Sequence, residues 1–546
     1  MPEFRTVTIT PTNRGLFVGA PPHRLGPGFS PRSPNVRIRD GFTEQRPGLG
    51  DFNDAPIGDA DGVDTANMTI VNTFLYRTEV GGSEIIAITG GPTDADRKFF
   101  QSAASVWNDK TAAIVLKGIS TEPYDATIAP TPSQTDVFYA SNGVSDLTTE
   151  FIKWTGTGNI TAFNGAPGPA KTITTFANRL VIGHIFDGTA IRGLRVGWSA
   201  FGDAENWTSA NSGQTELIDT PDFITRLLPI RGSLVIYKEN SIFLGRETGN
   251  FIVPIGFALH NRNVGAIAGF SVAAAGEGNH FFLGDDNVYA FDGNTLTPIG
   301  DAIKRDLRNI NRAALRQVFA TVDPKNTEYR LFVPEGTDPH PKVCWVFNWR
   351  ENHWNRWELP FLTSGARVIG GTGQTWGDID TTGELWSQVG DVSWGDLITT
   401  GSPATIVANK DRSVDEMAER FPNDNSLAIV SSWESADIDM AGQPSRDRGT
   451  VLTTGHLKTL ARVQLRFKGT GTTNNLKCLV SGDGGNTFQS ATPTPASLTS
   501  DGGVVNFDIW TTATKFRVRF ENDQTNQGLP GISEVVLHYL PGPQTF

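Results

Sequence analysis

The stretch 281-FFLGDDNVYAFDGNTLTPI-299 contains three short apolar runs separated by two polar turns. The runs Phe281–Leu283, Val288–Phe291 and Thr295–Ile299 have the length of strands and are rich in aromatic and aliphatic residues. The segments between them, Gly-Asp-Asp-Asn and Asp-Gly-Asn, consist of residues that tight turns favour. The stretch therefore predicts three antiparallel strands within about twenty residues.

The same plan recurs along much of the chain, as a strand ending in an aromatic residue, a short polar turn and a second strand. The intervals from Phe243 to Tyr289, Trp345 and Trp386 stay close to the roughly 40–50 residues of a four-stranded propeller blade. We therefore predict a mainly β protein built as a β-propeller of about six or seven blades. The repeats start at Phe151, Ser241, Asn287, Val343 and Glu384.

Composition divides the chain into four parts, an N-terminal arm, a body, a linker and a C-terminal module. Residues 1–60 are rich in Pro, Gly and Arg and predict an extended N-terminal arm, and residues 61–400 form the propeller body. Residues 431–546 predict a β-sandwich-like module, because 462-RVQLRFK-468 and 515-KFRVRFE-521 alternate with period two.

Two short helices are expected between the strands. In 301-DAIKRDLRNI-310 the apolar residues follow helical spacing. In 413-SVDEMAERF-421 a capping box joins Ser413 to Glu416, with apolar residues on one face and Pro422 at the end. The second helix lies in residues 401–430, which we interpret as a linker between the body and the module.

The bulk composition argues against several classes of protein. The 546 residues carry 46 basic and 58 acidic side chains, a net charge of −12, without the basic clusters that grip nucleic acid. The eight histidines have no metal-ligand spacing, and we expect neither a metal nor a cofactor. No apolar run reaches the roughly 18 residues of a membrane helix, so we expect no stable membrane insertion.

Cysteine usage and the N-terminal stretch indicate the compartment. Only Cys344 and Cys478 are present, each within an apolar strand-like run, which predicts buried free thiols and no disulfide framework. The start MPEFRTVTITPTNRG has no signal-peptide pattern. We expect the chain to fold in a reducing cytoplasm.

The segment 480-VSGDGGNTF-488 resembles the Asp-box, a hairpin motif common in sialidases and related propellers. Its matching positions are Ser481, Asp483, Gly485, Thr487 and Phe488. In those enzymes the motif lies at hairpin turns remote from the catalytic groups. Here one complete copy falls in the C-terminal module, and we interpret it as a structural turn held by the Asp483 side chain and a positive φ at Gly485.

No catalytic constellation emerges from the residues, so we expect no enzyme. Glycoside hydrolysis needs two carboxylates facing across a cleft, whereas most carboxylates here lie in turns. The 13 tryptophans form several close pairs, such as Trp345 with Trp349 and Trp354 with Trp357. We expect them to pack between blades, with a carbohydrate platform as the alternative.

Taken in order, several stretches resemble the tail hub or nozzle proteins of short-tailed bacteriophages, also described as packaged-DNA-stabilisation proteins. The resemblance runs over residues 15–360, more than half of the chain. It rests on the order of short motifs: SPNVRIRDGFTEQRPGLGDF, FANRLVIGHIFDGTAIRGLRVGWSAFGDAENWTS, GSLVIYKENSIFLGR, NVGAIAGFSVAAAGEGNHFFLGDDNVYAFDGNTLTPIGDAI and WNRWELP.

The resemblance implies a structural virion protein assembled in the host cytoplasm. Six copies would form a ring below the portal and adaptor proteins, in contact with tail fibres or spikes. The ring would extend the DNA channel, retain packaged DNA and open for ejection, without sequence-specific DNA binding or catalysis. The net negative charge would then face a passing duplex as a weakly repellent wall.

Two other functions stay open. A carbohydrate-binding or glycan-cleaving propeller, such as a tailspike or adhesin, predicts a pocket with paired carboxylates and exposed tryptophan. A cellular propeller scaffold predicts cleaner blade repeats and no N-terminal arm.

Overall fold

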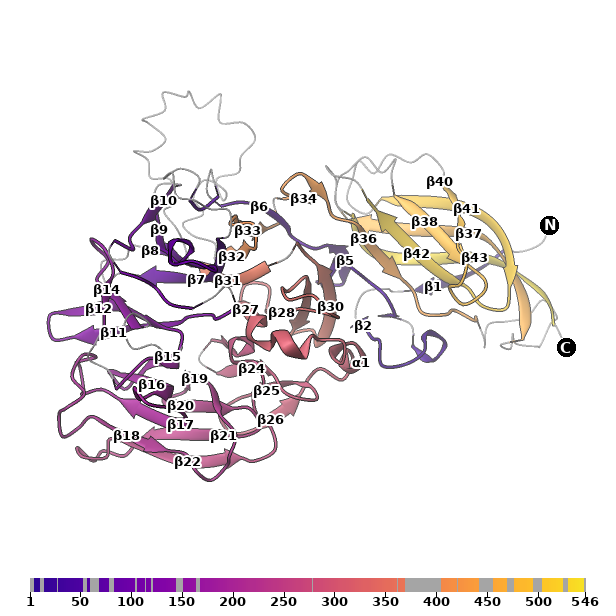
Figure 1. The fold of residues 1–546 in the computed structure, drawn as a ribbon. Helices are drawn as coiled ribbons and strands as arrows, with labels where there is room; N and C mark the ends of the chain where they lie inside the picture. The colour runs from indigo at the N-terminus through magenta and orange to yellow at the C-terminus, as the bar shows by residue number, and fades with distance from the viewer. Residues whose placement is uncertain are drawn as a thin grey trace.

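A computed structural model covers the chain and consists almost entirely of β-strands (Figure 1). It describes residues 4–544 apart from 10–13, 27, 53–55, 59–67, 78–82, 104–105, 113, 119–120, 144–150, 164–166, 277, 361, 369–403, 420, 441–454, 469–475, 494–502 and 524–528. The mainly β prediction is confirmed. The last repeat, which starts at Glu384, lies outside the described residues.

The central part of the chain, here called the body, is a series of small antiparallel sheets. Within the described residues, six of them have four strands that follow one another along the chain. In order, the strands are β7 (Thr69–Arg77), β8 (Ser83–Gly90), β9 (Phe99–Ala103) and β10 (Val106–Asp109); β11 (Asp125–Thr131), β12 (Gln134–Ser141), β13 (Phe151–Trp154) and β14 (Thr161–Ala162); β15 (Ala170–Phe176), β16 (Arg179–Phe186), β17 (Ile191–Trp198) and β18 (Gly213–Glu216); β19 (Ile224–Ile230), β20 (Ser233–Lys238), β21 (Ile242–Glu247) and β22 (Ile255–Asn261); β23 (Ala273–Ala275), β24 (Asn279–Leu283), β25 (Val288–Phe291) and β26 (Leu296–Pro298); β27 (Phe319–Asp323), β28 (Glu328–Val333), β29 (Val343–Asn348) and β30 (His353–Glu358).

The stretch 281–299 forms the strands that its pattern predicts. β24, β25 and β26 pair in antiparallel register, with Phe281 opposite Ala290 and Tyr289 opposite Pro298. Gly293 in the second turn has a φ of 91°, a conformation that glycine adopts without strain. Local sequence is therefore sufficient to specify this hairpin pair.

A seventh body sheet joins distant parts of the chain. Its strands run in the order β31 (Leu362–Val368), β32 (Ala404–Asn409), β33 (Val414–Ala418), β6 (Gly48–Asp51), β34 (Asn423–Asp424) and β35 (Leu427–Ala428). Strands β32 to β35 lie within residues 401–430, which we predicted as a linker, and they belong to a body sheet. The N-terminal strand β6 lies between strands from the end of the body.

The prediction of a helix at 413–421 is wrong, because Val414–Ala418 is a strand paired on both sides. Val414 and Met417 would share one face of a helix, but in a strand they point to opposite faces. Here Val414 packs against Trp107 and Ile406, and Met417 packs against Trp357 and Val407. Burial on both faces outweighs the local helical signal.

Neighbouring body sheets share hydrophobic cores in a circular order. Each of the first six sheets shares a buried cluster with the next one along the chain. The seventh shares one with the first, through Ile406 and Val414 against Ile70 and Phe100. Where β31 meets β7, the hydroxyls of Ser364 and Thr73 are 3.1 Å apart. The predicted propeller of six or seven blades stays a prediction at this point.

The C-terminal part, here called the module, has two sheets around one core. One sheet runs β4 (Val36–Arg39), β5 (Phe42–Gln45), β43 (Gly531–Gln544), β37 (His456–Lys468), β41 (Val504–Ala513) and β40 (Thr492–Pro493), with β1 (Arg5–Ile9) also paired to β43. The other runs β36 (Ser431–Glu434), β42 (Arg517–Asn522), β38 (Lys477–Ser481) and β39 (Gln489–Ser490). The inward residues predicted from alternation are buried in the shared core: Val463, Leu465, Phe467, Phe516, Val518 and Phe520.

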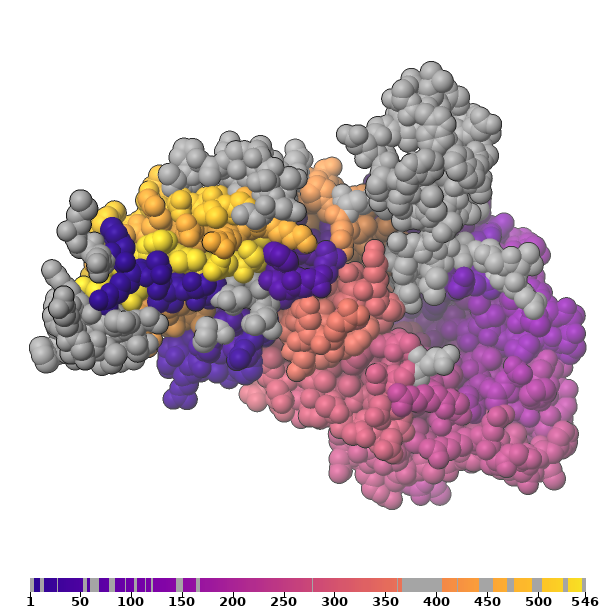
Figure 2. Space-filling model, turned by 180° about the vertical axis from the view of Figure 1, so that it is seen from behind, coloured from indigo at the N-terminus to yellow at the C-terminus, as the bar shows by residue number. Residues whose placement is uncertain are grey.

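The N-terminal segment, here called the arm (residues 4–52), connects the module to the body. It contributes β1, β4 and β5 to a module sheet and β6 to the last body sheet. A short parallel pair, β2 (Gly15–Leu16) and β3 (Phe29–Ser30), lies between β1 and β4 along the chain. Figure 2 shows the arm, in indigo, lying along the module and reaching the body. The indole N–H of Trp357 donates to the Val36 carbonyl at 2.9 Å, which fixes the arm on β30.

Helices are few and short in the described residues. They are α1 (Lys304–Leu307) and the 3₁₀ turns η1 (Pro22–Arg24), η2 (Asp94–Asp96), η3 (Gly269–Ser271) and η4 (Arg312–Gln317). The helix predicted at 301–310 is reduced to α1, although its apolar residues Ile303, Leu307 and Ile310 are buried. Of these helices, none is long and apolar enough to cross a membrane.

The predicted interior positions of the cysteines and of three tryptophans are confirmed. Cys344 and Cys478 are buried free thiols, and burial raises the pKa of both. Trp345, Trp354 and Trp357 are also buried. Trp386 and Trp394 lie outside the described residues.

Candidate functional site

Of the five residues of the Asp-box-like segment, Ser481 ends β38 and the other four lie in the turn between β38 and β39. The Asp483 carboxylate accepts the backbone N–H groups of Asn486 at 3.0 Å and Thr487 at 2.9 Å, and the Thr487 hydroxyl at 2.6 Å. The Ser481 hydroxyl donates to Asp483 at 2.7 Å and accepts the Gly485 N–H at 2.8 Å. Gly485 has a φ of 91°.

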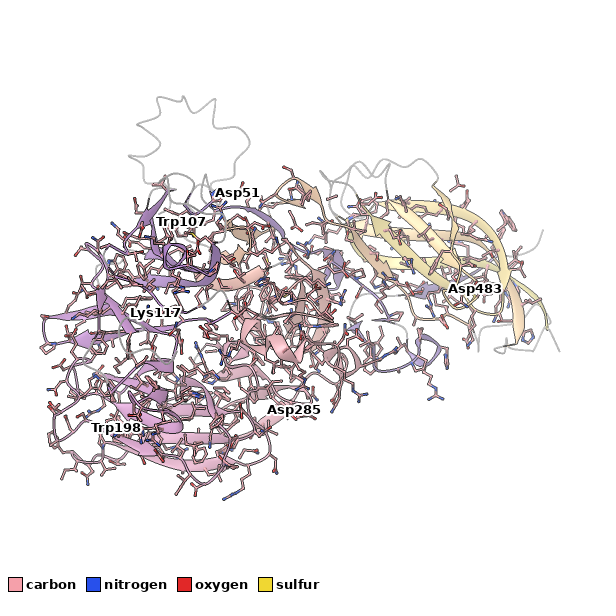
Figure 3. The ribbon with its side chains drawn as sticks, viewed as in Figure 1. Asp51, Trp107, Lys117, Trp198, Asp285 and Asp483 are labelled. Carbon is pink, nitrogen blue, oxygen red and sulfur yellow. The ribbon has the colours of Figure 1, made fainter. Side chains whose placement is uncertain are left out.

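This turn has the contacts of a structural element. Hydrogen bonds from Thr487 and Ser481 hold the pKa of Asp483 well below its usual range, so its carboxylate is an ionised acceptor for loop donors. The Phe488 ring lies 3.8 Å from the guanidinium carbon of Arg519. Figure 3 shows Asp483 in the module, on the other side of the molecule from Trp198 in the body.

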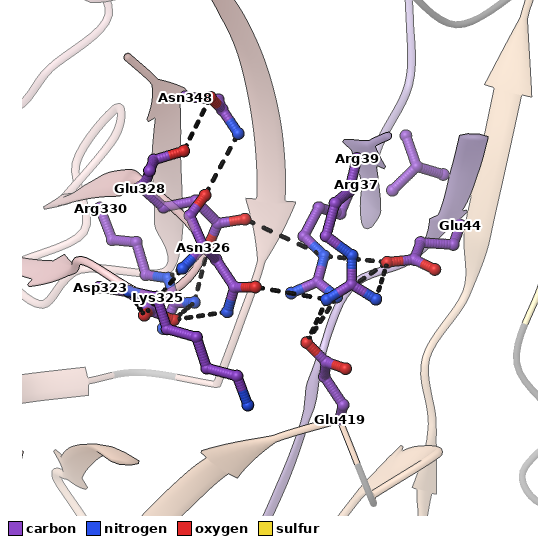
Figure 4. A network of polar contacts seen from close by, with 12 residues as sticks. Arg37, Arg39, Glu44, Asp323, Lys325, Asn326, Glu328, Arg330, Asn348 and Glu419 are labelled. Atoms are coloured by element: carbon purple, nitrogen blue, oxygen red, sulfur yellow. Dashed lines mark hydrogen bonds and ion pairs between the residues drawn. The ribbon is translucent and has the colours of Figure 1, made fainter. Parts of the chain in front are cut away.

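A polar network joins the arm to the body, and we call it the junction (Figure 4). Arg37 on β4 is almost fully buried and forms ion pairs with Glu44 at 2.8 Å, Glu419 at 2.9 Å and Glu328 at 3.9 Å. These residues come from the arm, the last body sheet and the sixth body sheet. Burial alone would lower the pKa of Arg37, but the three carboxylates raise it.

The junction contains a second buried arginine, Arg330, which shares Glu328 with Arg37. Arg330 on β28 pairs with Glu328 at 2.6 Å and with Asp323 at 2.7 Å, and it also donates to the Thr405 hydroxyl at 2.8 Å. Its pKa is raised because the charges of Glu328 and Asp323 outweigh burial. The junction is therefore a set of buried cations that are each paired with carboxylates.

A different group of cations lines a cavity of about 220 Å³ in the body. Its wall comes from strands β15, β16, β17 and β19, from the short helices η3 and η4 with the residues just before η3, and from the segments just before β11 and just after β12. We call it the basic cavity, because Lys171 and Arg316 lie in its wall. Its other polar lining residues used below are Glu122, Asn142, His184 and Thr225.

The basic cavity leaves its lysine without a paired acid. Among the described residues Lys171 forms no ion pair. Burial followed by the charge of Arg316 lowers its pKa, and the charge of Glu239 offsets only part of that shift. Arg316 is largely exposed and lies 3.8 Å from Glu122. The buried carboxylate of Asp125, on the neighbouring strand β11, pairs with Arg226 at 2.5 Å and accepts the Thr172 hydroxyl at 2.8 Å.

His184 enters the wall of the basic cavity from a distorted strand. The pairing of β16 with β17 shifts register between Gly183 and Ile185, and His184 has a φ of 58°, which is uncommon outside glycine. Its Nδ1 donates to the Ile224 carbonyl at 3.1 Å, so the neutral ring carries its proton there. Burial lowers the pKa of His184 to about 4, with the Lys171 charge adding to the effect.

An open groove of about 720 Å³ lies between the second and third body sheets, and we call it the outer groove. Asp203, Glu205 and the half-buried Trp207 are among its lining residues. Glu205 pairs with Lys153 at 2.5 Å and accepts the Tyr139 hydroxyl at 3.3 Å. The Trp207 indole N–H donates to the Ala204 carbonyl at 2.9 Å.

Sequence reasoning identified the turn at Asp483 but not the basic cavity. The cavity residues come from strands of two sheets and from connecting segments far apart in the sequence, and they share no motif. The one local signal is His184, a polar residue within the otherwise apolar run 180-LVIGHIF-186. In the part of the chain that the structure describes, no three His, Cys, Asp or Glu side chains are grouped to hold a metal ion.

Comparisons with known proteins give no family. No protein-family model and no curated protein match the chain. Among solved structures, the extracellular domain of the putative one-component system BT4673 from B. thetaiotaomicron aligns at 9% identity with a TM-score of 0.41, over 93% of this chain and 63% of that one. PorZ, a surface component of the type-IX secretion system of Porphyromonas gingivalis, aligns at 9% identity with a TM-score of 0.36, over 87% and 59%. The chain thus spans about three fifths of the length of each.

Proposed function

We propose that the chain is a structural protein of a short-tailed bacteriophage tail. Six copies form the nozzle or hub ring below the portal and adaptor, where the ring extends the DNA channel, retains packaged DNA and allows its ejection. The body is a seven-bladed propeller and the protein is not an enzyme. The chain assembles in the host cytoplasm and resides in the virion tail, in contact with tail fibres or spikes.

The circular order of the body sheets supports the propeller. Seven small sheets share cores with their neighbours, and the last sheet shares one with the first. Hydrogen bonds tie the first strands together, such as Thr175 Oγ1 to the Ile128 carbonyl at 2.6 Å and the Leu227 N–H to Thr172 Oγ1 at 3.0 Å. Insertion of β6 into the last sheet ties the start of the chain to the end of the body.

Two unlike apolar patches carry the proposal of a ring. At the tip of the β21–β22 hairpin, Phe251, Ile252 and Val253 are consecutive and all more than half exposed. On the module, Phe4 and Trp510 are exposed and their rings meet edge to face at 6.3 Å. A head-to-tail ring needs two different complementary surfaces on each copy, whereas a two-fold dimer needs only one.

Electron cryomicroscopy of assembled particles tests this function. We expect six copies around the channel below the portal, with the β21–β22 hairpin at the contact between neighbours. The double variant Phe251→Asp/Val253→Asp should prevent the ring from forming, while Val106→Asp, an exposed apolar position outside both patches, should not. Finding the chain only in peripheral spikes, or not in the particle, would overturn the proposal.

The outer groove favours one alternative, a carbohydrate-binding protein. Its two carboxylates beside a half-buried tryptophan match the residues that a glycan-binding propeller requires. The test is binding to a panel of bacterial surface glycans, with Trp207→Ala as the variant and exposed Trp510→Ala as its control. Binding that is lost only with Trp207→Ala would favour this alternative, and glycan cleavage would make the protein an enzyme.

A further inference from the structure

We infer that the basic cavity binds a small organic anion, a carboxylate or phosphate ester attached to an apolar body. This inference goes beyond the proposed function and does not depend on it. A chain that fails to form rings would keep the site, and a ring without the site would keep its tail role.

The charges of the cavity wall require an anion. Lys171 and Arg316 both line the cavity, and Glu122 is the acidic side chain of that lining, 3.8 Å from Arg316. Asp125, at the start of β11, holds Arg226 and the backbone of β15 and is not part of the lining. A partly buried ammonium without a carboxylate is costly, and an anionic ligand would satisfy it with a charge-assisted hydrogen bond.

The rest of the wall fits an apolar group the size of one ring. Phe270, Ile267, Leu315 and Ile191 lie around the cavity, whose volume of about 220 Å³ excludes a polymer. The Arg226 guanidinium lies over the Phe270 ring, with its carbon 4.9 Å from the ring centre. A bare inorganic ion would leave these apolar surfaces facing water, so an anion with a carbon body fits better.

The strained backbone at His184 supports a site. Residues held in the left-handed region at a bulge cluster at binding sites, because such strain persists where the surroundings impose it. Here the hydrogen bond to the Ile224 carbonyl and the edge-to-face contact with Phe223, at 5.7 Å between ring centres, hold the imidazole in place. The His184 ring is therefore held in one orientation in the wall without any ligand.

Ligand-observed NMR on the full-length protein tests the inference with matched probes. Benzoate and phenyl phosphate carry an anion on one ring, benzamide is the neutral counterpart, and inorganic phosphate is the anion alone. We expect at least one of the two aromatic anions to bind at least about tenfold more tightly than benzamide and inorganic phosphate. Lys171→Met should weaken this binding at least about tenfold, and Lys325→Met, at an exposed site, should not.

A second variant protects the test against indirect effects. Arg316 lies at the exposed rim of the cavity. Arg316→Gln should therefore also weaken the binding of benzoate or phenyl phosphate while leaving the unfolding temperature unchanged. Equal binding of benzamide and benzoate, binding of inorganic phosphate alone, or aromatic-anion binding that survives Lys171→Met would each overturn the inference. Absence of binding by both aromatic anions would do so as well.

Discussion

The junction and the basic cavity both contain cations removed from water, yet their surroundings differ. At the junction Arg37 and Arg330 each face two or more carboxylates, and those charges raise the pKa of both. In the basic cavity Lys171 has no paired carboxylate, and burial lowers its pKa. Paired cations hold parts of the fold together, whereas an unpaired cation in a cavity is available to a ligand.

The largest effect should come from breaking the junction at its most buried cation. Arg330→Met leaves Asp323 without its arginine and leaves buried Glu328 with only the more distant Arg37, at 3.9 Å, and we expect a loss of about 3–5 kcal/mol in the free energy of unfolding. Arg462→Met, which removes an exposed pair with Asp508, should cost less than about 1 kcal/mol. Denaturant unfolding measures both, and equal costs would show that the junction is not a structural element.

Asp415 on β33 is the reverse case, a buried acid without a paired cation among the described residues. It should make the stability of the fold depend on pH. Burial raises its pKa to about 6, and its Oδ2 has no hydrogen-bond partner. Because the folded-state pKa lies above the unfolded one, its stabilising contribution is present below about pH 4 and is lost as pH rises through about 6. From pH 4 to 7 the wild type should lose about 2 kcal/mol relative to Asp415→Asn. A difference that stays constant with pH would contradict this.

The turn at Asp483 should show a smaller and local effect. Asp483→Ala removes the acceptor of the Asn486 and Thr487 N–H groups, so we expect faster amide exchange there and a smaller loss of stability than for Arg330→Met. Asp508→Ala, an exposed strand position in the same module, serves as the control. Loss of a hydrolase activity on Asp483→Ala, with the fold intact, would instead give the turn a catalytic role.

The smallest effect should come from the basic cavity itself. Lys171→Met removes a cation that the fold leaves unpaired, so the free energy of unfolding should rise or stay within about 1 kcal/mol of the wild type. Thermal unfolding in ligand-free buffer measures it. A loss as large as that of Arg330→Met would mean that Lys171 is as structural as the junction arginines.

The sequence predicted the features that depend on residues close together in the chain. It missed those that depend on contacts between distant residues. The hairpins of 281–299 follow from turn residues and alternating runs within the stretch itself. Val414 and Met417 have helical spacing but lie in a strand, because each side chain is buried in a different hydrophobic cluster, on opposite faces of that strand. Lys171 and His184 are neighbours across the β15–β16 hairpin, but Arg316 joins them in the cavity wall from η4, more than 130 residues further along the chain, and no local pattern encodes that meeting.

The contrast between the junction and the basic cavity is tested most directly by the pKa of Lys171. Carbon-13 methylation of the lysines, with Lys171→Met to assign the signal, allows its titration to be followed by NMR in ligand-free protein. We predict a pKa below the ordinary value of 10.5 that rises when benzoate or phenyl phosphate is added. A pKa at or above 10.5 without any anion would show that a carboxylate of the chain already pairs with Lys171, and the contrast would fail.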